Sequence, residues 1–286
     1  DVKKINIYYT PRVYKIKSND RVLQGFSLAF DASVEEVWMA FNTAATLVVG
    51  TTETMKAGPD LPGILTKLNV TCFSTVPTLL NTIPSNELPT VRLIIVGGEA
   101  CSRELANRWS TDINGKVDFF NTYGPTEATV ICTVQRCQPK EREKRVTIGK
   151  PISTYRVYVV APGTINLVPP GAVGELIIGG EGVSLLGYIG DKEKTEARFV
   201  IDPYVKTNVK DDDNNDAIVS KCKMYHSGDL VRFDPRTGEL EFCGRMDQQV
   251  KIRGYRIELG EIESALLEDA DIKQAVVIDY AHNDNE

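Results

Sequence analysis

The sequence has no long apolar run, little histidine and no closely spaced cysteine pair, and each absence excludes a class of protein. No stretch of about 18 apolar residues occurs, so a membrane-spanning helix is not indicated. Residues 1–20 also lack the continuous apolar core of a signal peptide. Six scattered cysteines and two histidines favour reduced thiols over disulfides or zinc. We therefore expect a cytoplasmic protein with no membrane partner.

The sequence also lacks an excess of positive charge, since 39 acidic residues outnumber 33 lysines and arginines. The formal net charge of −6 argues against a broad nucleic-acid-binding surface. The remaining composition, with 42% hydrophobic and 25% charged residues, is that of a globular protein. A chain of 286 residues is long enough for a large core and for more than one packed unit.

Short apolar runs alternate with helical patterns between residues 20 and 134. The predicted strands are "RVLQGFSL", "ATLVVG", "VTCFSTV", "VRLIIVGG" and "KVDFFN", and the predicted helices include "LPGILTKL" and "SRELANRW". Because the strands are almost continuously apolar, we predict an α/β fold with a parallel sheet covered by helices on both faces.

One further helix has its own start signal, since Ser33 is followed three residues later by Glu36, as in a capping box. Its apolar residues recur at helical spacing and predict one buried face, formed by Val34, Val37, Trp38 and Phe41.

The pattern changes after about residue 150, where "RVYVV" and "GELIIGG" predict shorter strands of a β-rich, distorted-barrel part. The acidic stretch 205–223 is predicted to be a mobile surface insertion. Beyond Gly244 the sequence predicts a strand pair, an amphipathic helix near 260–268 and another strand. We expect a large lobe over 1–246 (α/β over 1–150, β-rich over 151–246) and the truncated start of a small α+β lobe over 247–286.

Three polar or glycine-containing loops follow predicted strands: "FDAS" (30–33), "VGGEA" (96–100) and "NTYGPTE" (121–127). Ligands of open α/β sheets bind beyond the carboxyl ends of the strands, where such loops converge. Each loop alone is a weak signal, because a glycine pair after a strand is usually a turn. Together they predict a pocket.

Four longer motifs carry a family resemblance. "NTYGPTE", "GELIIGGEGVSLLGY", "YHSGDLVRF" and "GRMDQQVKIRGYRIELGEIE" occur in this order, and together they resemble the core motifs of adenylate-forming enzymes. The match is to amino-acid adenylation domains of non-ribosomal peptide synthetases. The resemblance implies conversion of an amino acid and ATP to an aminoacyl adenylate and pyrophosphate. Transfer to the phosphopantetheine thiol of a carrier-protein domain would follow.

The resemblance also implies a nucleotide site. Tyr123 would stack on adenine with Asn121 nearby, and Asp229 would accept hydrogen bonds from both ribose hydroxyls. The remaining nucleotide-binding residues would be Gly98, Glu99 and Gly124. Two plainer interpretations stay open: Tyr123 as a buried aromatic residue beside a turn, and Asp229 as a turn-capping aspartate.

Catalytic roles follow from the same resemblance. Thr126 would contact phosphate, and Glu127 would help to hold Mg²⁺, which prefers carboxylate oxygen. Arg245 would assist at the ribose or phosphates, Asp247 would be the hinge between the lobes, and Lys251 would act in the thiolation arrangement.

The basic residues of the last motif have an alternative explanation. Lys251, Arg253 and Arg256 would form a solvated basic face balanced by neighbouring glutamates. His226 stands where the family usually has Arg or Lys, so no catalytic role is assigned to it.

Alignment of the loops with the family implies a pocket for the amino acid. Asp31 would pair with the α-ammonium group that every α-amino acid carries. The pocket residues would be Asp31, Ala32, Glu35, Ser74, Ile95, Gly97, Thr122, Val130 and Ile131.

Glu35 is the residue that predicts the substrate. It lies one helical turn from Asp31, so both carboxylates can face the same space. A second carboxylate in an apolar pocket is costly unless a cation meets it, which favours lysine or ornithine. The set also resembles the lysine-type pattern of poly-lysine synthetases. The alternative is that Glu35 turns to solvent beside Glu36, a free neighbour.

Two family features are absent from the sequence. The phosphate loop that normally precedes "FDAS" is not found in residues 1–20, and the segment with the adenylation lysine would follow Glu286. We expect residues 1–286 alone to adenylate poorly. Two other functions stay open: an acyl-CoA or aryl-acid ligase, against which Asp31 argues, and a non-catalytic remnant that at most binds nucleotide or a partner.

Overall fold

The computed structural model describes residues 10–110, 117–138, 146–205, 222–247, 249–252, 255–269 and 271–280. Most of the predicted acidic insertion (206–221) lies outside the described residues, as do Arg253 and His282.

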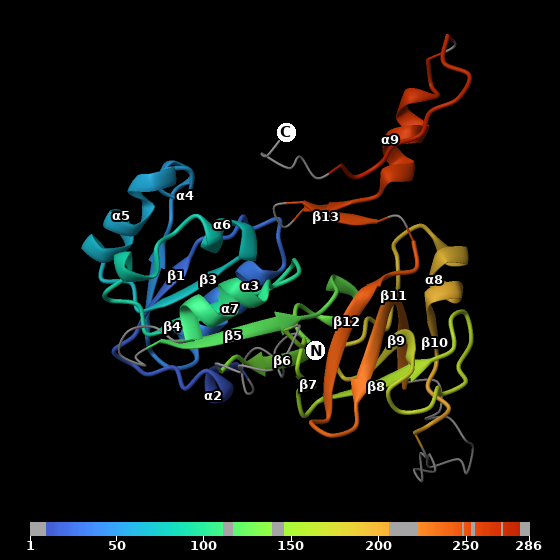
Figure 1. Cartoon of the computed structure of the whole chain (residues 1–286), viewed down its shortest axis with the longest axis horizontal. Helices are drawn as coiled ribbons and strands as arrows, with labels where there is room; N and C mark the ends of the chain where they lie inside the picture. Colours follow the sequence, from blue (N-terminus) through green and yellow to red (C-terminus); the bar gives the residue numbers. More distant parts are fainter. Residues whose placement is uncertain are drawn as a thin grey trace.

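The first part of the chain is built on a seven-stranded sheet in the order β2-β1-β3-β4-β5-β6-β7 (Figure 1). Strands β1 to β5 are parallel, and β6 and β7 join antiparallel. The strands are β1 Arg21–Gln24, β2 Thr46–Val49, β3 Cys72–Thr75, β4 Leu93–Val96, β5 Asp118–Tyr123, β6 Thr133–Arg136 and β7 Lys150–Pro151. The helices are α2 Thr10–Val13, α3 Ala32–Phe41, α4 Thr52–Met55, α5 Leu61–Lys67, α6 Pro77–Asn81 and α7 Arg103–Ser110.

Alternate residues of β4 face two separate cores. Ile94 and Val96 pack with apolar residues of α5, α6 and α7, whereas Leu93 and Ile95 pack with Met39 of α3. Both faces of the sheet are therefore covered, which explains why its strands are almost continuously apolar. The parallel α/β sheet expected from the sequence is confirmed.

The second part is an antiparallel sheet in the order β10-β11-β9-β8, with β12 also paired to β11. Among the described residues these pairings leave the sheet open rather than closing a barrel. Its elements are β8 Tyr155–Val160, β9 Val173–Gly180, α8 Lys192–Arg198, β10 Phe199–Ile201, β11 Lys223–Asp234 and β12 Glu239–Arg245.

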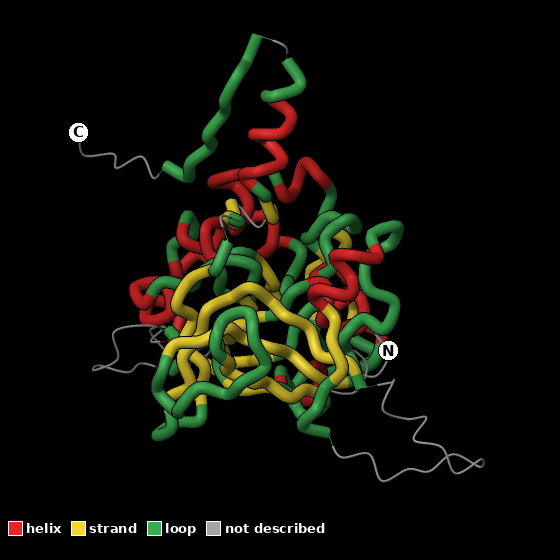
Figure 2. The backbone as a smooth tube through the Cα atoms, turned by 90° about the vertical axis from the view of Figure 1, so that its right-hand side faces the viewer, coloured by secondary structure: helices red, strands yellow, loops and turns green. Residues whose placement is uncertain are grey.

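The last part consists of the hairpin β13 Val250–Ile252 and β14 Tyr255–Ile257, followed by α9 Leu259–Leu266. Helix α9 and the segment after it project from the strand-rich body (Figure 2). The further strand expected near the end is wrong for the described residues. Val276, Ile278 and Tyr280 are 72%, 73% and 76% exposed there, and no neighbouring strand pairs with them. The lobe boundary at Asp247 stays a prediction.

The predicted face of α3 is also wrong. Phe41 is 60% exposed, while the buried side carries Ser33, Glu36 and Met39. Glu36 forms no capping box, because its carboxylate instead accepts hydrogen bonds from the backbone N–H groups of Gly25 and Phe26 at 3.1–3.2 Å. These amide donors stabilise a buried polar group, and the helix turns that side inward.

Within the described part of the chain, no helix has the length and apolar character needed to cross a membrane.

Candidate active site

Two adjoining cavities open at the carboxyl ends of the parallel strands. The first is lined by all nine residues predicted for the amino-acid pocket: Asp31, Ala32, Glu35, Ser74, Ile95, Gly97, Thr122, Val130 and Ile131. The second is lined by all six residues predicted for the nucleotide: Gly98, Glu99, Asn121, Tyr123, Gly124 and Asp229. Arg245 and Lys251 line both cavities. The structure therefore brings together residues separated by more than 200 positions in the sequence.

The loop after β5 forms the wall between the cavities. The strand continues through Tyr123, three residues beyond the apolar run "DFF", so the turn begins only at Gly124. A Cβ atom at Gly124 would lie 2.5 Å from the carbonyl oxygen of Val130, so only glycine fits. Thr129 and Val130 have φ values of 56° and 69°, which is strained for β-branched residues.

Hydrogen bonds from the β-rich part hold this strained loop. The Thr129 hydroxyl donates to the carbonyl oxygen of Gly182 at 2.6 Å, and the Tyr155 hydroxyl donates to that of Ala128 at 2.5 Å. The β-rich part thus adds hydrogen bonds to those that the loop makes within itself. Such strain is concentrated at functional sites.

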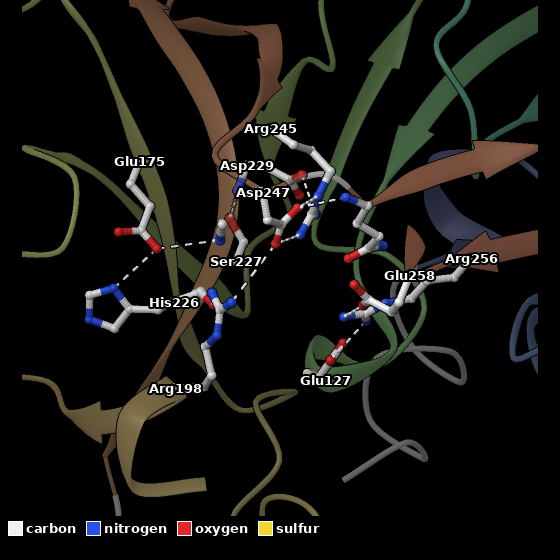
Figure 3. A network of polar contacts seen from close by, with 12 residues as sticks. Glu127, Glu175, Arg198, His226, Ser227, Asp229, Arg245, Asp247, Arg256 and Glu258 are labelled. Atoms are coloured by element: carbon white, nitrogen blue, oxygen red, sulfur yellow. Dashed lines mark hydrogen bonds and ion pairs between the residues drawn. The ribbon is translucent and has the colours of Figure 1, made fainter. Parts of the chain in front are cut away.

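Asp229 lies at the centre of a buried polar network (Figure 3). Its carboxylate accepts a hydrogen bond from the Tyr123 hydroxyl and pairs with Arg245 Nη1 at 2.6 Å. Burial and the nearby carboxylate both raise the pKa of Tyr123, so its hydroxyl stays protonated and donates. The side chain of Asp229 thus bonds to Tyr123 and Arg245, in place of the turn-capping role left open by the sequence.

Arg245 joins this network to the predicted hinge. Its Nε and Nη2 atoms bind the two carboxylate oxygens of Asp247 at 2.6 and 2.7 Å. Arg198 of α8 lies 3.9 Å from the same carboxylate. A bidentate pair of this kind fixes orientation as well as distance.

Glu127 lies in the short helix η4 Thr126–Ala128 and has one paired and one unpaired oxygen. Its Oε1 accepts from the Tyr188 hydroxyl at 2.8 Å and from Arg256 Nη1 at 3.0 Å. Its Oε2 is buried without a hydrogen-bond partner among the described residues. Although burial opposes it, these bonds and the Arg256 charge hold the pKa of Glu127 below its usual value, so the carboxylate is ionised.

Arg256 is 42% exposed and pairs with Glu258, as the basic-face interpretation of the sequence had it, but it also makes a pair that this interpretation did not include. It bridges Glu127 of η4 and Glu258, directly before α9, at 3.0 and 3.2 Å. The Glu127–Arg256 pair is a direct contact between segments 129 residues apart.

Glu35 faces the first cavity and not solvent, which contradicts the alternative orientation. It is 4% exposed, and its Oε1 has no hydrogen-bond partner in the described part of the chain. Burial raises its pKa to about 7; the Tyr14 hydroxyl opposes the rise and the Asp31 carboxylate adds to it. Its neighbour Glu36 is not free either, and burial raises its pKa to about 8 although the Gly25 and Phe26 amides oppose the rise.

These two carboxyl groups predict an unusual pH dependence of stability. Both pKa values are raised above the unfolded value of 4.5, so the folded state keeps protons that the unfolded state releases. The free energy of unfolding should therefore fall as pH rises from about 5 to about 8, by a few kcal/mol per group. Denaturant titrations across this range measure the fall.

Glu36→Gln is the informative variant for this measurement. It removes one titrating group and should flatten the decline. A wild-type stability that is constant or rises between about pH 5 and pH 8 would contradict the expected burial of both groups.

Several lining residues were missed from the sequence. Phe26 and Phe30 form an edge-to-face pair with ring centroids 5.1 Å apart at the wall of the first cavity, and Gln249 lines both cavities. Phe30 is the first residue of "FDAS" and Phe26 lies four residues before it, which is the signal that could have pointed to them. Gln249 is 6% exposed, and its Oε1 is another buried oxygen with no partner in the described region.

The sequence profile described as AMP-binding enzyme matches residues 2–189. The chain belongs to this family. The resemblance drawn from the motifs is thereby confirmed at the family level, and the fold agrees with it.

Named relatives extend this picture. The chain is 44% identical to a linear gramicidin synthase of Brevibacillus parabrevis, over 96% of this chain and 3% of that protein. It is 38% identical to delta-poly-L-ornithine synthetase of Acinetobacter baumannii, over 92% of this chain and 18% of that protein. The chain thus spans a small part of the relatives that it matches.

Two solved structures share the fold of this chain. One is an NRPS protein containing adenylation and PCP domains, with a TM-score of 0.76 at 26% identity, covering 91% of this chain and 43% of that chain. Another is the Vibrio cholerae adenylation domain AlmE in complex with glycyl-adenosine-5′-phosphate, with a TM-score of 0.74 at 26% identity, covering 90% and 46%.

Proposed function

We propose that this chain is the amino-acid-activating part of a non-ribosomal peptide synthetase and that its substrate is lysine or ornithine. The reaction joins the amino-acid carboxylate to the α-phosphate of ATP and releases pyrophosphate. The aminoacyl group then passes to the phosphopantetheine thiol of a carrier domain. The observation that carries the substrate proposal is the buried, unpartnered Oε1 of Glu35 in the cavity that Asp31 also lines.

The amino acid would bind by its two ammonium groups. Asp31 would pair with the α-ammonium, and Glu35 would pair with the ammonium at the end of the side chain. Between them the cavity offers apolar contacts from Ile95, Val130 and Ile131, which suit the methylene chain of lysine or ornithine. An ionised Glu35 in this position is costly unless a cation meets it, and a basic substrate provides that cation. The printed name of the poly-ornithine relative supports the same class.

The nucleotide would occupy the second cavity. Tyr123 and Asn121 would contact adenine, Gly98 and Glu99 would lie beside it, and Asp229 would accept from the ribose hydroxyls. The Asp229 carboxylate has lone pairs beyond those used by Tyr123 and Arg245, so it can accept further hydrogen bonds. Gly124 would allow close approach of the backbone to the nucleotide.

The reacting phosphate would lie where the cavities meet. Thr126 would donate a hydrogen bond to it, and Arg245 would supply positive charge nearby. A transfer at phosphorus is accelerated mainly by positioning and charge neutralisation, which these groups provide. The described residues contain no group of three or more metal-binding side chains. A Mg²⁺ ion held by one carboxylate and the phosphates of ATP needs no such group.

Glu127 fits that requirement. Its carboxylate is ionised, its Oε2 is buried without a partner among the described residues, and it follows Thr126, which lines the first cavity, so it could serve as the oxygen ligand. When bound there, Mg²⁺ would neutralise charge on the phosphates of ATP.

Transfer to the carrier would involve the last part of the chain. We propose Asp247 as the hinge and Lys251, which lines both cavities, as a residue of the thiolation arrangement. The solved NRPS protein containing adenylation and PCP domains supports a carrier partner.

The test is amino-acid-dependent ATP–pyrophosphate exchange by the complete adenylation domain, scanning the amino acids. Lysine or ornithine should give the highest exchange. Exchange with neutral amino acids alone would refute the basic-substrate proposal, and no exchange with any amino acid would favour the non-catalytic remnant.

A further inference from the structure

We propose that Glu175 is a positioning residue. It would fix the bend of β11 that carries Asp229 and so orient the Asp229 carboxylate toward the ribose. This inference rests on the proposed nucleotide site. Glu175 lies in β9, across β11 from Arg245 (Figure 3), and lines neither cavity. Any effect of Glu175 on binding of the ribose must therefore be indirect, through the bend to which Asp229 belongs.

Strand β11 carries an irregularity at this point. Its register with β9 jumps from His226 opposite Ile177 to Leu230 opposite Glu175. Three residues of β11 (227–229) therefore stand against the single residue Leu176. Irregularities of this kind redirect a side chain beside an active site. Here Asp229 has no paired residue in β9, and in the pairing of β11 with β12 it lies opposite Arg245.

The bend leaves backbone groups that need other partners, and Glu175 supplies one. Its Oε1 accepts a hydrogen bond from the N–H of Gly228 at 3.3 Å. Gly228 has a φ of 73°, a backbone conformation that favours glycine. Its Cα also lies close to the guanidinium of Arg245, because a Cβ atom added there would be 3.2 Å from Nη2. Glu175 therefore fixes the backbone of Gly228, which directly precedes Asp229 and lies against Arg245.

Glu175 is itself anchored from the side away from the cavities. Its Oε1 also contacts His226 Nδ1 at 3.2 Å, and its Oε2 accepts from the N–H of Gly163 at 3.2 Å. The side chain is almost fully buried, and although burial opposes it, the bonds from His226, Gly163 and Gly228 hold its pKa below the usual value. An ionised, buried carboxylate with these partners is a rigid support.

The chain contains a matched control. Asp202 is a second buried carboxylate, directly after β10 of the same sheet. It bonds Arg156 at 3.1 Å and Tyr158 at 3.1 Å, and neither of these partners lines a cavity. Asp202→Asn should lower the stability of the protein and leave its preference for the ribose hydroxyls unchanged. Comparison with this variant separates positioning from general destabilisation.

The experiment measures binding of AMP, 2′-deoxy-AMP and 3′-deoxy-AMP to residues 1–286 by isothermal titration calorimetry. The wild type should bind AMP about tenfold or more tightly than the deoxy nucleotides, since each lost hydroxyl leaves Asp229 with one hydrogen bond fewer. Asp229→Asn should remove most of this preference. Glu175→Ala should also reduce it several-fold, with little change in affinity for the deoxy nucleotides, and Glu175→Gln, which can still accept from Gly228, should reduce it less.

The outcomes distinguish the two levels of the proposal. If Glu175→Gln and Glu175→Ala keep the full preference while Asp229→Asn loses it, the positioning role is wrong and the nucleotide site stands. If the wild type binds no AMP or does not discriminate, both are wrong. Thermal melts confirm folding. If Glu175→Ala does not fold, the test rests on Glu175→Gln. An unchanged ratio of the affinities for AMP and the deoxy nucleotides in that variant would then overturn the positioning role of Glu175.

Discussion

Asp31→Asn is expected to raise the KM for the amino acid by about 30-fold or more while leaving the KM for ATP nearly unchanged. Asp31 would make the one charge-assisted contact that every α-amino acid requires. Removing one partner of such a pair costs about 2–5 kcal/mol, and the partial exposure of Asp31 places the expected effect at the lower end. Pyrophosphate exchange by the complete domain, with each substrate varied in turn, gives both constants.

The matched control for this variant is Asp60→Asn, since Asp60 is an exposed acidic residue that lines neither cavity. It should leave both constants unchanged. Equal changes in the two KM values of Asp31→Asn, or none, would show that Asp31 does not contact the amino acid.

Glu35→Gln should change which amino acid is preferred. The carboxylate of Glu35 is the negative charge proposed to meet the substrate side chain, and breaking a buried charge pair costs about 3–5 kcal/mol. The ratio of kcat/KM for lysine to that for norleucine should therefore fall by about 100-fold or more. Norleucine is the suitable comparison because it keeps the four side-chain carbons of lysine and lacks only the terminal ammonium group.

Glu36→Gln is a close control for this second prediction. It alters the adjacent buried glutamate, whose carboxylate faces the amides of Gly25 and Phe26 rather than the cavity. The lysine-to-norleucine ratio should survive this change. A ratio that falls equally in both variants would mean that the effect comes from the helix as a whole and not from Glu35.

The general fold could be predicted from the sequence because the patterns that indicate its strands and helices lie within short stretches of neighbouring residues. Apolar runs such as "VRLIIVGG" became buried strands, and the motif loops came together at one edge of the sheet, as parallel topology requires. The cavity residues could be named in advance because the family resemblance supplied their register.

The predictions that proved wrong or incomplete depend on contacts with residues distant in the sequence, which a local pattern does not show. Helix α3 turns Glu36 inward because Gly25 and Phe26 offer amide donors, which spacing within the helix cannot reveal. The pair between Arg256 and Glu127 was missed because the two residues lie 129 positions apart. The run ending at Tyr280 has strand-like residues, but a strand also needs a neighbour, and none pairs with it among the described residues.

The central claim is that one site holds a basic amino acid and an adenosine nucleotide side by side. The most direct measurement compares binding of two non-hydrolysable aminoacyl-adenylate analogues, lysyl- and norleucyl-sulfamoyl adenosine, to residues 1–286 by calorimetry. The account predicts that the lysyl analogue binds about 100-fold more tightly and that Glu35→Gln removes most of this difference. Equal affinity of the wild type for the two analogues, or no binding of either, would contradict it.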